Sequence, residues 1–464
     1  MTKPRLALGS GTRAARIALW AAAAAALAAG AAWSAAAPAA APRRFPHVLL
    51  ITVDTLRTDH LSGYGYARRT TPHLDALLAR GGRFTSARTV EPLTGPSLAS
   101  ILTSLPPHEH GATRNGLPVR AGLPSLSKIL ARRGYRTAAF VGNWTLRGQL
   151  SGLHEHFSTY EVVTSRKRWY GMIKNEATAE DLNAAAVAWL DRHLQSEPGR
   201  PVFLWVHYVE PHAPYRYWPQ YAERLGLADR EDPAKRDRYD TEVAFVDQAI
   251  GSLLGAVGSR LPGADTLTLF TADHGESLGE HEYWGHGRHL FDDGLRIPMA
   301  IAWPGRIAAR TVAVPATNLD LAPTVLSLVS LPRAPGFRGF DWSGALTNGE
   351  RPVERGSCFQ AHKGAVQSIQ DAGRARRGGL LEVGYITAGR KEIVRVPGGM
   401  RWVYDLERDP GELASAVPLR SAVSPELRAC LAEVERGLTA ADALPAAPVD
   451  QESIETLRAL GYID

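Results

Sequence analysis

Four continuous apolar runs, each closed by polar residues, dominate the hydrophobic pattern of the chain. They are HVLLITVD (47–54), TAAFVGNW (137–144), PVFLWVHYVEPH (201–212) and DTLTLFTADH (265–274). A continuous apolar run of this length is typical of a strand that is buried on both faces of a parallel sheet. We therefore predict four core strands at these positions.

Segments with helical periodicity lie between these runs, at 71–81, 125–134, 179–194 and 241–258. Alternating strands and helices predict an α/β fold, in which a large mixed, mostly parallel sheet lies between layers of helices. Gly134 closes the second of these helices, as glycine often does.

The pattern changes near residue 350. Residues 378–396 and 398–412 alternate apolar and polar positions with turns between them, which predicts a small antiparallel sheet. Residues 424–438 have the pattern of a helix packed on that sheet, and residues 450–464 that of a short docking helix. The 464 residues exceed the usual size of a single core, so we predict a catalytic domain at 45–350 and an α+β subdomain at 351–464.

Residues 1–44 have the composition of a targeting segment. A basic stretch ends at Arg16, and an alanine-dominated apolar run with several Ala-x-Ala sites follows it. The segment is either a cleaved signal peptide or a membrane anchor formed by residues 17–40. Both alternatives predict an exported protein, periplasmic or secreted.

The net charge of +6 comes from this same segment, because residues 1–44 hold six basic residues and no acidic one. Residues 45–464 are therefore neutral overall. A nucleic-acid-binding function loses its electrostatic basis, so no nucleic-acid partner is expected.

Polar side chains close the four predicted strands. They are Asp54, Asn143, His212 and the pair Asp273 and His274. Because parallel sheets bind ligands at the carboxyl ends of their strands, we expect these residues to meet in one crevice. A mixture of carboxylates and imidazoles suits one divalent metal ion, and Mn, Zn or Mg fit it better than Ca.

Thr94 starts the stretch TGPSLASILT, which has the pattern of a helix with proline in its first turn. Threonine at a helix entrance is in most proteins an N-cap. The same place also offers free backbone N–H groups and the positive end of the helix dipole, which favour an anion.

Five stretches together resemble the sulfatase branch of the alkaline phosphatase superfamily. They are HVLLITVDTLRTDHLSGYGY, TPHLDALLARGGRFTSA, HYVEPHAPY, TADHGESLGEH and GLRIPMAIAWPG, and they occur in the family's order from about residue 46. The resemblance implies an alkaline phosphatase-like fold, metal ligands at Asp54, Asp273 and His274, and a nucleophile at Thr94 that also contacts the metal. It further implies contacts with the ester or leaving group from Asn115, Asn143, Thr145, His212 and His286.

Three features of the chain depart from the family pattern. Sulfatases carry Cys or Ser at the nucleophile and Arg four residues later, which a maturation enzyme reads, whereas this chain has Thr94 and Leu98. The family's Lys-x-His pair is replaced by Asn143 and Thr145. Thr55 stands where many members have another acidic ligand. These departures are similar to the phosphate- and phosphonate-ester branches, in which an unmodified threonine is the nucleophile.

The sequence therefore predicts a metal-dependent hydrolase or transferase of phosphate, phosphonate or sulfate esters with an anionic ester as its substrate. Two alternatives stay open: a true sulfatase acting on sulfated glycans or aryl sulfates, and a catalytically silent protein of this fold that binds glycans. The leaving group and the oligomeric state are not indicated by the sequence.

Five further residues carry weaker signals. His281 and His289 lie in a histidine-rich segment, and we expect them outside the metal shell or at the surface. Arg288 is a candidate to replace the missing positive charge. Cys358 and Cys430 could pair in an oxidising compartment, but we expect two separate thiols, because two cysteines form no disulfide framework.

Overall fold

A computed structural model describes residues 45–441, except 165–167, 170–171, 174–176, 228–232, 352–353, 365–378 and 419. The predicted N-terminal targeting segment and the helix predicted at 450–464 lie outside the described residues. Among the helices of the described ranges, none is both long enough and apolar enough to cross a bilayer.

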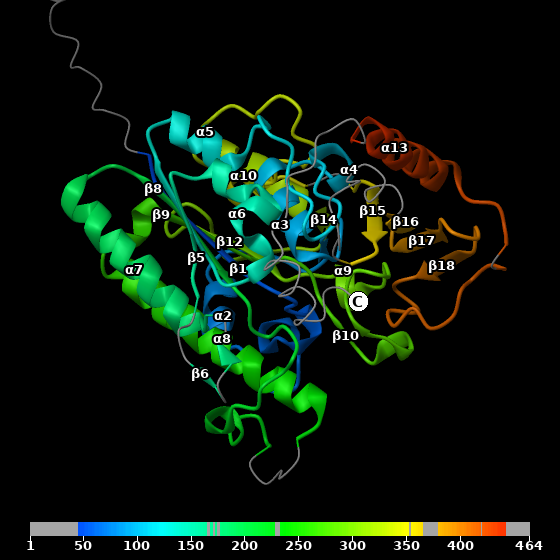
Figure 1. Ribbon diagram of the computed structural model, residues 1–464, viewed down its shortest axis with the longest axis horizontal. Coiled ribbons are helices and arrows are strands. Elements are labelled where there is room, and N and C mark those ends of the chain that lie inside the picture. The colour runs from blue at the N-terminus through cyan, green and yellow to red at the C-terminus, as the bar shows by residue number, and fades with distance from the viewer. Residues whose placement is uncertain are drawn as a thin grey trace, which may run out of the picture. The chain divides into compact units, whose positions relative to one another are not determined.

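An eight-stranded sheet forms the core, in the order β13-β2-β12-β9-β1-β8-β4-β5 (Figure 1). Only the β12 pairings with β2 and β9 are antiparallel, so the sheet is mixed and mostly parallel, as predicted. Its strands are β1 (His47–Val53), β2 (Gly82–Phe84), β4 (Arg136–Val141), β5 (Thr159–Val162), β8 (Val202–Tyr208), β9 (Thr266–Ala272), β12 (Met299–Ala302) and β13 (Arg310–Val312).

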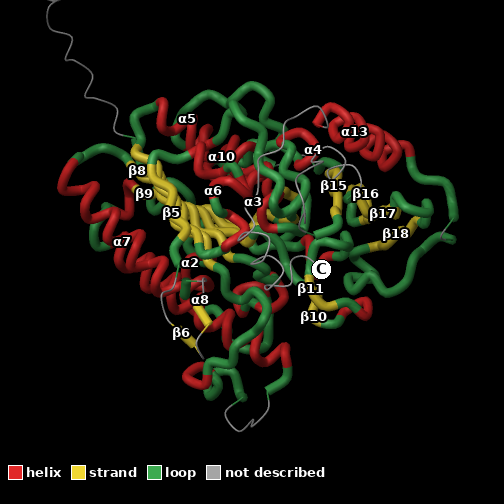
Figure 2. The backbone as a smooth tube through the Cα atoms, viewed as in Figure 1, coloured by secondary structure: helices red, strands yellow, loops and turns green. Residues whose placement is uncertain are grey.

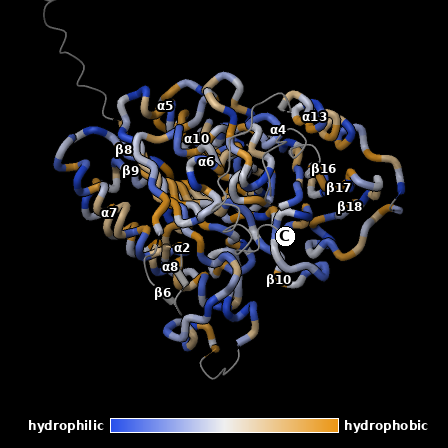
Figure 3. Tube along the Cα trace, in the orientation of Figure 1, coloured by the Kyte–Doolittle hydropathy of each residue, from blue (hydrophilic) through white to orange (hydrophobic). Residues whose placement is uncertain are grey.

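The four predicted core strands are confirmed, since they correspond to β1, β4, β8 and β9. All seven residues of β8 are buried, and in β1 only His47 is partly exposed. Figure 3 shows hydrophobic residues concentrated in this part of the sheet. Burial of apolar side chains on both faces supplies the main driving force for this arrangement.

Helices cover both faces of the sheet (Figure 1). One layer holds α2 (Pro72–Leu78), α7 (Ala179–Ser196) and α8 (Lys235–Gly258), and the other holds α3 (Thr94–Thr103), α5 (Leu126–Arg132) and α10 (Leu321–Leu328). Short elements fill the connections seen as loops in Figure 2: β3 (Ala87–Arg88), α4 (Pro107–His110), α6 (Gly148–Ser151), β6 (Arg168–Trp169), β7 (Met172–Ile173), β10 (Ser277–Leu278), β11 (Trp284–Gly285), α9 (Asp292–Leu295), β14 (Ala316–Thr317) and α11 (Ser343–Thr347).

The C-terminal part is a four-stranded antiparallel sheet with one helix packed against it, as the sequence predicts. The strands β15 (Ser357–His362), β16 (Leu380–Thr387), β17 (Arg390–Arg395) and β18 (Arg401–Asp405) follow one another in space, and the helix is α13 (Pro425–Ala441). Apolar side chains of α13, including Leu427 and Val434, pack with Val383 and Val394 of the sheet.

A buried ion network joins the C-terminal sheet to the rest of the fold. The ammonium of Lys391 in β17 donates to Asp292 Oδ1 at 2.6 Å and lies 2.8 Å from Glu412 Oε1. Asp292 also accepts from Arg88. Lys391 is only 1 % exposed, and removal of one partner from such a pair leaves an uncompensated buried charge.

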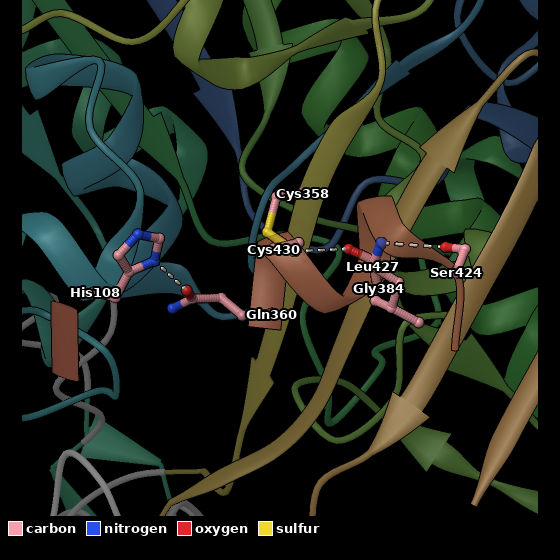
Figure 4. The surroundings of a disulfide bond; sticks show 7 residues. All are labelled: His108, Cys358, Gln360, Gly384, Ser424, Leu427 and Cys430. Carbon is pink, nitrogen blue, oxygen red and sulfur yellow. Dashed lines mark hydrogen bonds between the residues drawn. A yellow bond between two sulfur atoms is a disulfide. The ribbon is translucent and has the colours of Figure 1, made fainter. Parts of the chain in front are cut away.

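Cys358 and Cys430 form a disulfide, so the expectation of two separate thiols is wrong (Figure 4). Cys358 lies on β15 and Cys430 on α13, 72 residues later in the chain. Packing of α13 against the sheet brings the two Cα atoms to 5.8 Å, within the range that a disulfide needs. Ser424 accepts a hydrogen bond from the Leu427 backbone at the start of the same helix.

Candidate active site

The two central strands deliver the acidic residues of the site. Asp54 follows the last residue of β1, and Asp273 and His274 follow the last residue of β9. The Asp54 backbone N–H donates to the Tyr208 carbonyl at 2.9 Å, and that of Asp273 to the Val53 carbonyl at 3.2 Å. Hydrogen bonds between neighbouring strands therefore fix how close the two carboxylates lie.

Asp54, Asp273 and His274 form a buried group whose potential ligand atoms all lie within 4.8 Å of one another. His274 Nε2 is 3.7 Å from Asp54 Oδ1 and 3.6 Å from Asp273 Oδ2. Both of these carboxylate oxygens are buried without a hydrogen-bond partner among the described residues. Because unpaired buried oxygens are costly, this arrangement fits a divalent cation held by the three residues.

The pKa shifts of Asp54 and Asp273 also fit a bound divalent cation. Burial raises the pKa of Asp273 well above its ordinary value, and the neighbouring Asp54 charge raises it further. Burial alone would also raise the pKa of Asp54, but His207, His212 and His274 around it lower the value below the ordinary range. Without a cation, burial and the charge of Asp54 therefore favour the protonated form of Asp273. A bound divalent ion reverses this preference and lets both carboxylates ionise.

Burial lowers the pKa of the His274 imidazole to about 4. The ring is therefore neutral near pH 7, and Nε2 has a lone pair to offer to a metal. Its Nδ1 lies 2.8 Å from the Gly275 carbonyl, so Nδ1 carries the hydrogen and Nε2 faces the carboxylates. The hydrogen bond from His274 Nδ1 to the Gly275 carbonyl thus fixes the orientation of the imidazole ring.

Thr94 is the first residue of α3, while Leu93 occupies the N-cap position and makes no side-chain cap. The interpretation of Thr94 as the cap is therefore wrong by one residue. Its hydroxyl is fully buried and lies 3.3 Å from His274 Nε2. This contact places the Thr94 hydroxyl at the buried group formed by Asp54, Asp273 and His274.

Asn115 lies beside the start of the same helix. Its Oδ1 accepts from the Gly95 backbone N–H at 2.8 Å, whereas its Nδ2 is buried without a partner in the described part of the chain. A Cβ atom on Gly95 would approach Asn115 Oδ1 to 3.0 Å, so glycine permits this close contact. The unused Nδ2 is a donor next to Thr94 that could meet an ester oxygen.

Asn143 and Thr145 follow strand β4 and form a chain of hydrogen bonds that ends on Asp54. Asn143 Nδ2 donates to Asp54 Oδ2 at 2.5 Å, and Asn143 Oδ1 accepts from the Thr145 hydroxyl at 2.7 Å. Both side chains are buried. These contacts orient the Asp54 carboxylate, and the predicted contact of the two residues with the ester stays a prediction.

His212 and His286 are brought together, although 74 residues separate them. Their Nε2 atoms are 3.3 Å apart, so one of the two carries the shared hydrogen. The His286 ring centroid lies 4.4 Å from that of His274. Burial, together with the nearby His274 and His212, lowers the pKa of His286 well below its ordinary value.

Two residues near the candidate metal site, His207 and Glu276, were not predicted from the sequence. His207 is the next-to-last residue of the buried strand β8, and its Nε2 is 3.8 Å from Asp54 Oδ2. Glu276 is buried two residues after His274 and accepts a short hydrogen bond from the Tyr215 hydroxyl. A titratable side chain inside an otherwise apolar run was the available signal for His207.

His281, His289 and Arg288 of the histidine-rich segment lie outside the candidate metal site. The His281 ring stacks on Phe291 at 3.7 Å, and His289 Nδ1 lies 3.1 Å from Glu382 Oε1 of the C-terminal sheet. Arg288 is exposed. Neither histidine is part of the buried group formed by Asp54, Asp273 and His274.

The comparison with known proteins agrees with this geometry. Residues 46–331, more than half of the chain, match the family model named Sulfatase. Choline-sulfatase of Rhizobium meliloti is 28 % identical over 357 residues, which cover 62 % of this chain and 68 % of that protein. Human arylsulfatase A is 26 % identical over 462 residues, which cover 85 % of this chain and 88 % of the relative.

Solved structures share the fold. A protein in complex with its substrate D-glucosamine-2-N,6-O-disulfate has a TM-score of 0.68 at 19 % identity, covering 86 % of this chain and 99 % of that one. The phosphonate monoester hydrolase of Agrobacterium radiobacter has a TM-score of 0.62 at 22 % identity, covering 86 % and 96 %. The chain belongs to the sulfatase family and is a sulfatase-family ester hydrolase.

Proposed function

We propose that the protein hydrolyses phosphate, phosphonate or sulfate esters with Thr94 as an unmodified nucleophile beside one divalent metal ion. The observation that supports this most directly is the position of the Thr94 hydroxyl. It is buried 3.3 Å from His274 Nε2, next to the two unpaired oxygens of Asp54 and Asp273. Export to the periplasm or the medium is part of the same proposal and rests on residues 1–44.

Asp54, Asp273 and His274 would hold the metal, with the Thr94 hydroxyl as a further contact. When bound, a divalent ion supplies Lewis-acid neutralisation of the ester oxygens and lowers the pKa of a nearby hydroxyl. Mn, Zn and Mg suit the carboxylate and imidazole ligands better than Ca. Asn143 would keep Asp54 in the required orientation.

In the first step Thr94 Oγ1 would form a bond to phosphorus or sulfur, while the bond from that atom to the leaving oxygen breaks. The pair of His212 and His286 would take the hydroxyl proton and pass it to the leaving oxygen, so that an alcohol departs. A water molecule would then cleave the Thr94 ester and restore the hydroxyl. Asn115 Nδ2 would donate to an ester oxygen during both steps.

The loss of the sulfatase precursor residues suggests a substrate preference. A formylglycine hydrate can release sulfate by collapsing to the aldehyde, a route that is closed to Thr94. Attack at phosphorus is compatible with hydrolysis of a covalent threonine ester. We therefore infer that phosphate diesters or phosphonate monoesters are turned over faster than the matching sulfate ester.

Sulfate-ester hydrolysis is the second candidate, and the curated relatives support it, since choline-sulfatase and arylsulfatase A are among them. The third possibility, a silent glycan-binding protein, is disfavoured by the complete set of Asp54, Thr94, Asp273 and His274. A protein without catalysis has no use for two unpaired buried carboxylate oxygens, which cost folding free energy.

One panel of substrates tests the proposal. Aryl phosphate diester, phosphonate monoester and sulfate ester with the same leaving group are compared at one fixed metal concentration. We expect a phosphorus ester to be the best substrate. Thr94→Ala should lower kcat by at least about 10³-fold, because it removes a covalent nucleophile, whereas Thr94→Ser keeps a hydroxyl and measurable activity.

Two controls accompany the panel. Intact-mass analysis of the Thr94 peptide should show an unmodified residue, and metal analysis should find about one divalent ion per chain that Asp273→Ala loses. The proposal fails if the sulfate ester is the best substrate or if Thr94→Ala keeps most of the activity.

A further inference from the structure

A cavity of about 640 Å³ opens directly beside the candidate active site. Three of its lining segments are continuous with site residues: Tyr215 follows His212 by three positions, Glu276 follows His274 by two, and Gly285 precedes His286. A volume of this size is typical of pockets for ring-containing small molecules. The cavity is therefore placed to hold the part of a substrate that the ester chemistry does not touch.

An exposed aromatic side chain forms one wall of this cavity. Trp284 of β11 is 46 % exposed, one of the few large hydrophobic side chains left open to solvent among the described residues. Indole faces of this kind bind sugar and aryl rings by stacking and burial of apolar area.

A cation stands beside the indole. Lys235 Nζ, at the start of α8, lies 4.5 Å from the Trp284 ring centroid. Within the described ranges no carboxylate pairs with Lys235, although the neighbouring Arg236 pairs with Glu280 at 2.7 Å. An ammonium that lies over one face of an exposed indole, and that has no carboxylate partner among the described residues, is suited to an anionic group carried by a ring on the remaining exposed part of that indole.

Two further charged side chains, Arg238 and Glu276, line the cavity. The Arg238 Nε donates to the Pro233 carbonyl at 3.0 Å, and Glu276 is the carboxylate among the lining residues that the structure describes. Glu276 is buried and accepts from the Tyr215 hydroxyl, so it faces a donor of its own. Among the described lining residues, Lys235 is therefore the cation that the proposal assigns to an anionic group.

We propose that this cavity binds the alcohol part of the ester substrate, and that this part is a ring carrying a second anionic group, such as a carboxylate or sulfate. Trp284 stacks on the ring, and Lys235 pairs with the second anion. This inference rests on the proposed function, because the cavity is assigned to the leaving-group side of the same ester.

Two aryl phosphonates test the pairing: 4-nitrophenyl phenylphosphonate and its 3-carboxy-4-nitrophenyl counterpart. The measured quantity is the ratio of kcat/KM for the carboxylated ester to that for the parent. Lys235→Gln should lower this ratio about tenfold. Arg236→Gln, which removes an adjacent exposed charge outside the cavity lining, should leave the ratio as in the unaltered protein.

Trp284 is tested with the same two esters. Trp284→Ala should raise KM for both about tenfold, and Trp284→Phe should restore most of the loss, because a phenyl ring still offers a stacking face. An unchanged ratio in Lys235→Gln, or an unchanged KM in Trp284→Ala, overturns the inference.

A binding measurement separates this inference from the proposed function. Isothermal titration calorimetry of the two esters on Thr94→Ala, with and without Lys235→Gln, gives the same ratio from dissociation constants alone. If the esters bind with the expected ratio but are not hydrolysed by the unaltered protein, the proposed function fails and the subsite stands. If the esters are hydrolysed but Lys235→Gln changes neither the kcat/KM ratio nor the ratio of dissociation constants, the subsite fails and the proposed function stands.

Discussion

Asn143 shows how a single uncharged residue can orient a carboxylate that is predicted to be a metal ligand. Its amide links the Thr145 hydroxyl to Asp54 Oδ2 through hydrogen bonds of 2.7 and 2.5 Å. Groups that orient a ligand in this way typically contribute 10- to 100-fold to metal affinity or activity. The residue type could be predicted from the sequence, but its contact could not, because that depends on side-chain rotamers in the folded protein.

This chain of hydrogen bonds gives a residue-scale prediction. Thr145→Val removes the hydroxyl but keeps the shape, and we expect about a tenfold loss of kcat and weaker metal binding. Thr145→Ser keeps the hydroxyl and should retain both. Steady-state kinetics and metal titration on the two variants measure these effects. Equal kcat and equal metal affinity in Thr145→Val and Thr145→Ser would contradict the role assigned to the hydrogen bonds from Thr145 through Asn143 to Asp54.

Strand ends were the most predictable elements of the site. The apolar runs that precede Asp54, Asn143 and Asp273 became β1, β4 and β9, because continuous burial leaves few other structures open to them. The start of α3 was predicted one residue too late, since Leu93 rather than Thr94 occupies the cap. Sequence patterns define a helix by its apolar face, and that face does not distinguish the cap from the first turn.

The disulfide between β15 and α13 was beyond the reach of sequence reasoning. Two cysteines separated by 72 residues pair only if tertiary packing brings their Cα atoms close, and no local pattern reports this. The closed loop is long, so the cross-link restricts the unfolded chain strongly.

This connection gives the element-scale prediction. Cys430→Ser should lower the free energy of unfolding by about 4 kcal/mol, the chain-entropy value for a loop of this length. Cys358→Ser should act equally, and dithiothreitol should bring the unaltered protein to the same stability. Thiol titration under denaturing conditions should find no free thiol before reduction, and two reactive thiols at that point would refute the pairing.

At the scale of the whole molecule, buried histidines make stability depend on pH. Burial lowers the pKa of His156 to about 4 and that of His110 to about 3. His110 accepts from the Ala112 backbone N–H and contacts Ser100 of α3, so its neutral form is built into the fold. The unfolded chain takes up these protons near pH 6.5, whereas the folded protein does not.

The sign of the effect follows from linkage. Both folded-state pKa values lie below the unfolded ones, so the stability they provide is complete above about pH 6.5 and is lost as the pH falls. Between pH 6.5 and 5, each of the two histidines should cost about 2 kcal/mol of unfolding free energy.

Urea denaturation at pH 7.5 and 5.0 measures this loss. His156→Gln should reduce the difference between the two pH values by about 2 kcal/mol, since it removes one of the buried titrating groups. His154→Gln, at an exposed position two residues away, is the matched control. A pH dependence that is the same in all three proteins would show that His156 is not held neutral by the fold.

The pairing of the central strands has a consequence for how such a molecule can change. The Thr55 N–H donates to Asp273 Oδ1 at 3.2 Å although 218 residues separate them, because β1 and β9 are neighbours. The distance between the two carboxylates is thus independent of the length of the intervening chain. Loops that leave the strand ends, such as the one carrying Tyr215, can gain or lose residues while this distance is kept. Engineering a new specificity into this protein is therefore a problem of loop length, to be solved on a fixed reaction centre.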